Sequence, residues 1–318
     1  MSHSRDEVER AFAEFRQKGV EEHDWPGWAD LFTDDALYIE HNLGTLNGRA
    51  SIKNWIVNCM KDYQSMSLDI DWWMIEDDRV AFDIWNILPD PTGGTAEFKF
   101  PKTTVLHYAG DGKWSYEEDY YNPHDAARVF TEWLKAGGNR KTPQDRSLEG
   151  VKGFVPELSS ATHSRQEVEA EYERYSERAG IAVATGNWDQ WADQFTVDAR
   201  YREHHFGTFQ GREEIRSWIK SVMAPLPGME FPTDWYMIDG NRVTFRSIQR
   251  LPDPSGGTDH FEWPVHVILH YAGNGQWSYE EDVYNPDEGV AAIEAWVAAG
   301  GEIPPEVLAK LAGGEGAA

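Results

Sequence analysis

The sequence predicts an α+β protein made of two tandem domains, each with a curved antiparallel sheet packed against helices. Three observations lead to this fold class. The chain has 318 residues, which is enough for two domains of ordinary size. One pattern of segments occurs twice along it, and within each copy helical patterns come first and strand patterns follow. Helices and strands that are segregated along a chain are typical of the α+β class.

The repeat covers most of the chain. The segment WADLFTDDALYIEHNLGTLNGRASIKNWI, which starts at Trp28, returns as WADQFTVDARYREHHFGTFQGREEIRSWI from Trp191. From Trp25 to Pro123 the offset is a constant 163 residues, and about half of the positions are identical. Solenoid repeats are only about 20 to 50 residues long, so this repeat indicates duplication of a whole domain. We expect a first domain at 1–138, a linker at 139–163, a second domain at 164–301 and a C-terminal tail at 302–318.

Each domain is expected to begin with two helices. The first of them is indicated by Ser4 and its counterpart in the second copy, which precede a glutamate by three residues, as in a capping box. A strand over DALYIEHN and a helix over ASIKNWIVNCM follow. Two hairpins come next, the first turning at Asp77 and Asp78 and the second in the glycine-rich AGDGK. Trp133 lies on a closing amphipathic helix, and the second copy repeats this order.

The composition excludes several classes of protein. Lys and Arg number 29 against 55 Asp and Glu, a formal charge of −26 that repels phosphate backbones and anionic lipids, so neither nucleic acid nor a membrane is an expected partner. No apolar run approaches the roughly 20 residues of a membrane span, and the first residues lack a signal-peptide pattern. A single cysteine, Cys59, excludes an internal disulfide. We therefore expect a soluble, cytoplasmic protein.

The motif F-T-D-D-A-x-Y-x-E-H, followed by G-R-x-x-I-x-x-W, resembles the nuclear-transport-factor-2-like superfamily and more narrowly its SnoaL-like group of polyketide cyclases and ketosteroid isomerase-like proteins. The resemblance covers about residues 4–138 and 164–301. It implies cone-shaped domains, the cystatin-like α+β roll, each enclosing an apolar pocket. It also implies an intrachain pseudo-dimer that packs sheet against sheet, in place of the homodimer common in this superfamily, and it leaves further homo-oligomerisation open.

The resemblance also implies a general base in each domain. In ketosteroid isomerase the base lies four positions after the alanine of the D-D-A triplet, and the same count lands here on Glu40 and Glu203. Desolvation in an aromatic-lined pocket would raise the pKa of either carboxyl toward neutrality, where it can abstract a proton. The alternative is that each glutamate forms an ion pair at the pocket rim, with Arg49 in the first domain and Arg212 in the second.

The other two groups of the isomerase site have no match. Its phenolic donor would fall near Arg16 or Ala179, and its buried acid near Thr104 or Val267. Steroid isomerisation is therefore not supported. His41 and His204 follow the two glutamates, and Asp119 and Asp282 lie on the last strand, where a second carboxylate would divide acid from base roles. The alternative is that Glu117 and Asp119 pair with Arg49 and Arg79.

Metal and organic cofactors are not expected, because no His-x-His or His-Glu-x-x-His spacing occurs and the glycine-rich loops do not lead into helices. The predicted catalytic residues are Glu40, His41, Asp119, Glu203, His204 and Asp282. The predicted substrate-binding residues are Tyr38, Trp73, Tyr121, Tyr201, Tyr236, His266 and Tyr284.

These residues predict a cofactor-independent acid–base enzyme of the lyase, isomerase or dehydratase type. Its substrate would be a small hydrophobic molecule, aromatic or polycyclic, as in the catabolism of aromatic compounds. Two alternatives stay open: a carrier that binds a hydrophobic ligand without turning it over, and a chain with one catalytic and one structural domain. The exchange of Thr103 for His266 and of Lys102 for Val265 already makes the two pockets unequal.

Overall fold

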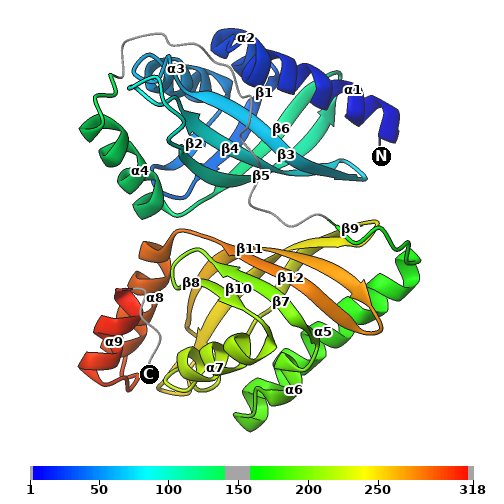
Figure 1. Cartoon of the computed structure of the whole chain (residues 1–318), viewed down its shortest axis with the longest axis vertical. Coiled ribbons are helices and arrows are strands. Elements are labelled where there is room, and N and C mark those ends of the chain that lie inside the picture. The colour runs from blue at the N-terminus through cyan, green and yellow to red at the C-terminus, as the bar shows by residue number, and fades with distance from the viewer. Residues whose placement is uncertain (1–2, 140–157, 314–318) are drawn as a thin grey trace. The chain divides into compact units, whose positions relative to one another are not determined.

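The computed structural model describes residues 3–139 and 158–313, which divide into two similar units, Met1–Val155 and Pro156–Ala318. In each unit a six-stranded sheet curves around helices (Figure 1). The predicted α+β fold class and the tandem duplication are confirmed. Most of the predicted linker, and residues 314–318 of the predicted tail, lie outside the described residues. The predicted packing of sheet against sheet stays a prediction.

Unit 1 follows the predicted order of helices and strands, with one short strand added. Its elements are α1 (Arg5–Arg16), η1 (Gln17–Glu21), α2 (Trp25–Ala29), β1 (Phe32–Glu40), β2 (Gly44–Asn47), α3 (Arg49–Met60), β3 (Ser67–Glu76), β4 (Arg79–Leu88), β5 (Phe98–Gly110), β6 (Lys113–Tyr120) and α4 (Pro123–Lys135). The side chain of Ser4 accepts a hydrogen bond from the Glu7 amide, so the predicted cap does begin α1.

Unit 2 repeats this order and adds a helix at its end. Its elements are α5 (Arg165–Thr185), α6 (Asp189–Ala192), β7 (Phe195–Glu203), β8 (Gly207–Gln210), α7 (Arg212–Met223), β9 (Thr233–Asp239), β10 (Arg242–Pro252), β11 (His260–Gly273), β12 (Gln276–Val283), α8 (Pro286–Ala298) and α9 (Pro305–Ala312). The segment predicted as a tail thus contains α9, and the side chain of Leu311 on that helix is buried in the core of unit 2.

The strand order brings the two predicted carboxylates of each unit together. The sheets run β2-β1-β6-β5-β4-β3 and β8-β7-β12-β11-β10-β9, and all neighbours are antiparallel except β1 with β6 and β7 with β12. In these parallel pairs Glu40 is the register partner of Asp119, and Glu203 is that of Asp282. Neighbouring strands lie only about 4.8 Å apart, so register partners project side by side from the same face.

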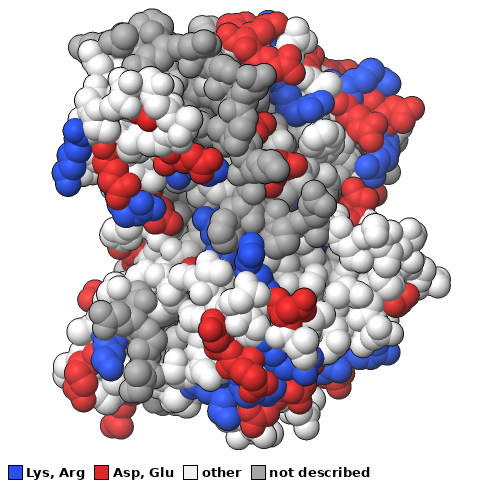
Figure 2. All heavy atoms as spheres, in the orientation of Figure 1, with Lys and Arg blue, Asp and Glu red and all other residues white. Residues whose placement is uncertain are grey.

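Each unit has its own aromatic core between the sheet and the helices. In unit 1 the fully buried side chains include Phe12, Phe32 and Trp114, and in unit 2 they include Phe195 and Trp277. Such large rings contribute much of the apolar area that each unit buries. None of the described helices is long and apolar enough to cross a membrane. On the face shown in Figure 2, acidic and basic side chains are interspersed.

Candidate active sites: a buried carboxyl cluster in each unit

Each unit contains a pocket between the concave face of its sheet and its helices. The cavity has a volume of about 370 Å³ in unit 1 and about 250 Å³ in unit 2, enough for a small organic molecule. Both linings are largely apolar and rich in aromatic rings. In unit 1 these rings include Trp25, Trp28, Trp55, Phe82, Phe100 and Phe130. In unit 2 they include Trp188, Trp191, Phe206, Trp218, Phe245 and Trp263. Three carboxyl groups face each of these apolar pockets.

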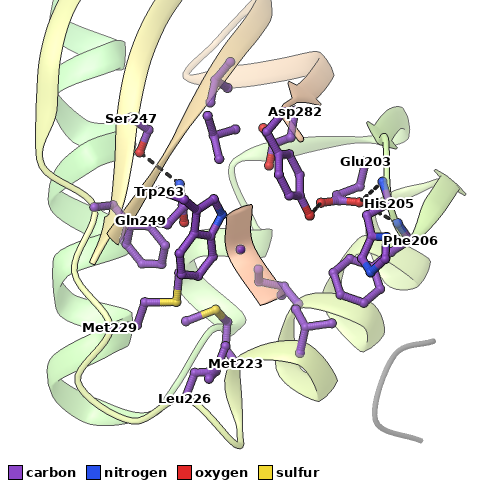
Figure 3. Close-up of a pocket in the computed structure, with 18 of the residues that line it drawn as sticks. Glu203, His205, Phe206, Met223, Leu226, Met229, Ser247, Gln249, Trp263 and Asp282 are labelled. Carbon is purple, nitrogen blue, oxygen red and sulfur yellow. Dashed lines mark hydrogen bonds between the residues drawn. The ribbon is translucent and has the colours of Figure 1, made fainter. Parts of the chain in front are cut away.

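Glu203 lies at the end of β7 and is held in a fixed orientation at the pocket of unit 2. Its Oε1 accepts a hydrogen bond of 2.5 Å from the Tyr284 hydroxyl. Its Oε2 accepts hydrogen bonds from the backbone amides of His205 at 2.7 Å and Phe206 at 2.5 Å (Figure 3). Burial raises the pKa of Glu203 to about 7, although these hydrogen bonds oppose the shift. Near neutral pH this carboxyl can therefore both accept and release a proton.

Two further carboxyls lie beside Glu203 on β12. Asp282 accepts a hydrogen bond of 2.7 Å from the Tyr201 hydroxyl, and Glu280 accepts one of 2.6 Å from the Tyr175 hydroxyl. Burial raises the pKa of Asp282 to about 8, with the negative charge of Glu203 adding to the shift. Burial also holds the pKa of Glu280 well above its usual range. Unit 2 thus keeps protons on carboxyl groups in an apolar site.

The pocket of unit 1 repeats this arrangement. Glu40 accepts hydrogen bonds from the hydroxyl of Tyr121 and from the backbone amides of Asn42 at 2.9 Å and Leu43 at 2.5 Å. Burial raises the pKa of Glu40, and burial holds the pKa of Glu117 well above its usual range. In each unit, therefore, the glutamate at the C-terminal end of the first strand is held by one tyrosine hydroxyl and two backbone amides.

Asp119 differs from its counterpart Asp282 in its partners. The ammonium of Lys102 donates to its Oδ2 at 2.8 Å, and the hydroxyl of Thr104 donates to its Oδ1 at 2.5 Å. The hydroxyl of Tyr38 donates to Oδ2 as well. Burial lowers the pKa of Lys102, but the charges of Asp119 and Glu117 outweigh it and leave the pKa raised, so the lysine stays protonated. Unit 1 therefore carries a partly buried ion pair, in which Asp119 is buried and the Lys102 side chain is 22% exposed, at the position where unit 2 has none.

Eight of the thirteen predicted site residues line the two pockets. They are Tyr38, Glu40, Asp119 and Tyr121 in unit 1, and Tyr201, Glu203, Asp282 and Tyr284 in unit 2. The sheet brings them together because Tyr38 and Glu40 lie two residues apart on one strand and Asp119 and Tyr121 do so at the end of another. The roles predicted for them stay predictions.

The other five predicted site residues lie away from the pockets. His41 and His204 point to the opposite face of their sheets, where their rings contact Glu118 at 3.0 Å and Glu281 at 2.7 Å. His266 is also on that face, 2.5 Å from the hydroxyl of Thr244. The period of two along a strand explains these placements, since each histidine is adjacent in sequence to a pocket-facing residue. We leave all three out of the proposed site.

Trp73 and Tyr236 also lie outside the pockets. Trp73 packs beside Phe12 under the guanidinium of Arg16 and is 43% exposed. Tyr236 packs on Tyr172, and its hydroxyl donates to a glutamate on α5. Both rings lie on the edge strand of their sheet and pack against the first helix of their unit. They therefore contribute to packing rather than to the lining of the pocket.

Ion pairs between these carboxyls and arginines are the alternative to a functional role that the sequence allows, and in the structure the arginines have other partners. Arg49 pairs with Asp34, and Arg212 donates to the carbonyl of Phe195. Arg79 donates to the ring of His107 at 3.3 Å. Glu40 and Glu203 are held by tyrosines and backbone amides instead, and Asp119 pairs with Lys102.

The alternation along SYEED predicts that Glu117 and Glu280 share the face of the aspartates two residues later, and both do line the pockets, although neither was among the predicted site residues. Lys102 was noted as a difference between the two pockets, but its pairing with Asp119 depends on which strands are neighbours and in which register. Tyr175 provides a phenol from the first helix of unit 2, one turn from Ala179, where the isomerase comparison looked for it.

Among the described residues, no three His, Cys, Asp or Glu side chains form a group that could hold a metal ion.

Comparisons with known proteins place these two sites in a family context. The sequence profile of the SnoaL-like domain matches residues 8–117 and again residues 172–280. No curated protein matches the chain in sequence. Solved structures do match, each over about one unit.

A Catenulispora acidiphila protein with a ketosteroid isomerase-like fold, solved in complex with trimethylamine, is 20% identical, with 35% of this chain and 84% of that chain covered and a TM-score of 0.30. An NTF2-like protein from Anabaena variabilis is 18% identical over 39% of this chain and 93% of its own, with a TM-score of 0.32. An epoxide hydrolase from M. tuberculosis is 17% identical over 41% and 89%, with a TM-score of 0.33.

Proposed function

The chain belongs to the SnoaL-like domain family, with two copies in tandem, and we propose that it is a cofactor-independent acid–base enzyme acting on a small hydrophobic molecule. The observation that carries this proposal is Glu203, a fixed carboxyl with a pKa of about 7 that faces an aromatic-lined pocket. A general base works best when its pKa lies near the operating pH. The reaction would be of the lyase, isomerase or dehydratase type.

The mechanism follows from the positions of the groups. Glu203 removes a proton from a carbon atom of the substrate, and the electron pair left behind moves toward an electron-withdrawing group. The proton then returns from Glu203 to another atom of the product or to the leaving group, so no external acid or base is consumed. Tyr284 and the two backbone amides hold the carboxylate in place between these steps. Tyr201 and Asp282, which lie beside Glu203 in the sheet, orient the substrate.

The apolar lining supports this chemistry in two ways. It accepts a hydrophobic, ring-containing molecule, and it excludes the water that would otherwise solvate the carboxylate and lower its basicity. Unit 1 offers the same base position at Glu40, but the aspartate beside it is in an ion pair with Lys102, whereas Asp282 accepts only the hydrogen bond from Tyr201. We therefore propose unit 2 as the principal catalytic unit.

The test begins with a thermal-shift screen of aromatic, terpenoid and polyketide-type compounds, followed by product analysis for each compound that binds. The variants are Glu40→Gln, Glu203→Gln and both together. We expect Glu203→Gln to lower turnover by about 10²- to 10⁴-fold, the usual contribution of a general base. Glu40→Gln reports what unit 1 adds.

Glu294→Gln on α8 is the matched control, because it removes the same charge at an exposed position of unit 2. Circular dichroism checks that each variant is folded. Full turnover in the folded double variant would overturn the assignment of the base. A compound that binds to the wild-type protein and yields no product would favour the carrier alternative.

A further inference from the structure

The two pockets contain the same polar cradle, and in one of them it is filled by a cation from the chain itself. In unit 1 the cradle consists of Asp119, Glu117 and Tyr38, and the ammonium of Lys102 lies 2.8 Å from Asp119 Oδ2. Thr104 completes the set by donating to Oδ1. Both oxygens of this buried carboxylate therefore have donors, as buried acceptors require.

In unit 2 the cradle is kept but both of these donors are lost. Val265 stands at the position of Lys102, and Val267 stands at that of Thr104. Asp282 retains only the hydrogen bond from Tyr201, and its Oδ1 is buried with no hydrogen-bond partner. Glu280, which is about 98% buried, has an Oε2 without a partner, as its counterpart Glu117 does in unit 1, so the difference between the units lies at the aspartate. Two carboxyl oxygens that face one cavity thus lack a donor.

The surroundings of these oxygens supply no cation of their own. Among the described residues that line this pocket, none is a lysine or an arginine. The one histidine among these lining residues is His205, and its ring contacts the backbone carbonyl of Leu311 at 2.6 Å. The remaining wall is mostly apolar and includes the indole rings of Trp263 and Trp218. In Figure 3, Glu203 and Asp282 lie near each other, with Trp263 and Met223 around the same cavity. Ring faces attract cations, and most strongly so when the ring is an indole.

We propose that the pocket of unit 2 binds an amine in its protonated form, with the ammonium between Asp282 and Glu280 and an apolar, ring-containing body among the tryptophans. The ammonium donates hydrogen bonds to Asp282 Oδ1 and Glu280 Oε2, in the way that Lys102 donates to Asp119. A primary or secondary amine is required, because a quaternary ammonium has no N–H and would leave both oxygens without a donor. The inference rests on the proposed function and names the substrate class of the same site, and Glu203 remains available as the base.

The electrostatics of the pocket agree with this geometry. A buried carboxyl without a cation keeps its proton, and a bound ammonium makes the ionised form favourable instead. In unit 1 the ammonium of Lys102 supplies the positive charge permanently. In unit 2 the ligand must supply this positive charge, so the affinity of the pocket depends on the charge of the ligand.

The test is calorimetric binding of 2-phenylethylamine and of 2-phenylethanol, an uncharged molecule of similar size and shape, to the full chain at pH 7.5. We expect one amine site per chain with an affinity at least tenfold higher than that for the alcohol. Val265→Lys gives unit 2 the lysine of unit 1 and should weaken amine binding at least tenfold. The reciprocal Lys102→Val should create a second amine site in unit 1. Val197→Lys, at a position of β7 that is 77% exposed, is the matched control and should leave the affinity unchanged.

Equal affinities for the amine and the alcohol would overturn the proposal, since they would mean that protonated carboxyls donate to a neutral ligand. Unchanged amine binding in folded Val265→Lys would overturn it as well. If that variant does not fold, Asp282→Asn, which keeps the shape of the side chain, must lower amine affinity at least tenfold. Turnover is measured separately, so that the two proposals can fail independently. If neutral compounds are turned over in a reaction that needs Glu203 and no amine binds, only the ammonium site is rejected. If an amine binds but the glutamine variants do not change turnover, only the role of Glu203 as the base is rejected.

Discussion

At the scale of single residues, Glu203 should set the pH dependence of the reaction. Burial raises its pKa to about 7, and only the ionised form can accept a proton. We therefore expect kcat/KM of the free enzyme to rise with pH and to reach half of its limiting value near pH 7. The measurement is a pH profile from 5.5 to 8.5 with a substrate that does not titrate in this range. A flat profile would show that another group limits proton abstraction.

Tyr175 gives a second residue-scale prediction. Its hydroxyl donates to the buried Glu280, and unit 1 has Phe15 at the equivalent position, so a phenyl ring fits this site. Tyr175→Phe removes a donor from a buried carboxyl and should lower the free energy of unfolding by about 1–3 kcal/mol.

Urea unfolding of the full chain measures this effect. Tyr172→Phe is the control, because that hydroxyl lies 3.0 Å from the Thr233 hydroxyl in a partly buried position rather than donating to a buried carboxyl, and its loss should matter less. An equal decrease in the free energy of unfolding in the two variants would mean that the hydrogen bond to Glu280 stabilises the fold no more than the contact with Thr233 does.

The sequence predicted part of each site for a clear physical reason. Strand alternation and a motif count are local, and they identified Glu40, Tyr38, Asp119 and their counterparts as pocket residues. The pairing of Lys102 with Asp119 depends on which strands are neighbours and in which register, and a single sequence does not reveal this. Trp73 was misplaced for the same reason, because both faces of its strand carry a large ring and only the packing of α1 decides between them.

At the scale of secondary-structure elements, α9 forms part of the pocket wall of unit 2. Leu308, Leu311 and Ala312 line the cavity, and Ile303 and Leu311 are buried in the core. A chain that ends after Glu302 loses these contacts. Because burial of one such side chain contributes about 1.5–3 kcal/mol, we expect unfolding of unit 2 to become easier by about 3 kcal/mol or more, and ligand affinity of its pocket to fall.

Chemical denaturation and ligand titration test this truncation. The matched control ends after Gly313, so that α9 is kept and only the residues beyond it are removed. Unchanged affinity and stability in the shorter chain would show that α9 is dispensable for the pocket.

The elements themselves were mostly predictable, and the exceptions are instructive. The first hairpin turn, at Asp77 and Asp78, was predicted because two acidic residues interrupt the strand pattern there, and Asp77 adopts the positive φ that tight hairpin turns use. The four-residue strands β2 and β8 were missed, since they are too short to show an alternating pattern. The parallel pairing of β1 with β6 was also missed, because it joins segments about 80 residues apart and leaves no local trace.

At the scale of the whole molecule, the buried carboxyls make stability depend on pH. The pKa values of Glu203 and Asp282 are raised by folding to about 7 and about 8, and those of Glu117 and Glu280 are raised as well. Between about pH 4 and pH 8 the folded state therefore binds more protons than the unfolded state. With that sign, this contribution to stability is fully present at low pH and is lost as the pH rises.

The shift in the pKa of Glu203 alone, from 4.5 to about 7, corresponds to about 3 kcal/mol in the free energy of unfolding. The test compares urea unfolding at pH 5 and pH 8 for the wild type and for Glu203→Gln with Asp282→Asn. The double variant should lose less stability on going to pH 8. Repulsion within a chain of net charge −26 has the same sign in both proteins, so the difference between them isolates the carboxyls. Identical losses would contradict the raised pKa values.

Duplication within one chain also changes what mutation can do. In a symmetric homodimer every substitution appears in both sites at once, so a lysine that neutralised one pocket would neutralise the other. Here a single codon change alters one copy and spares the other, and Lys102 and Val265 differ at one such pair of equivalent positions. The two pockets of one chain can therefore differ in specificity.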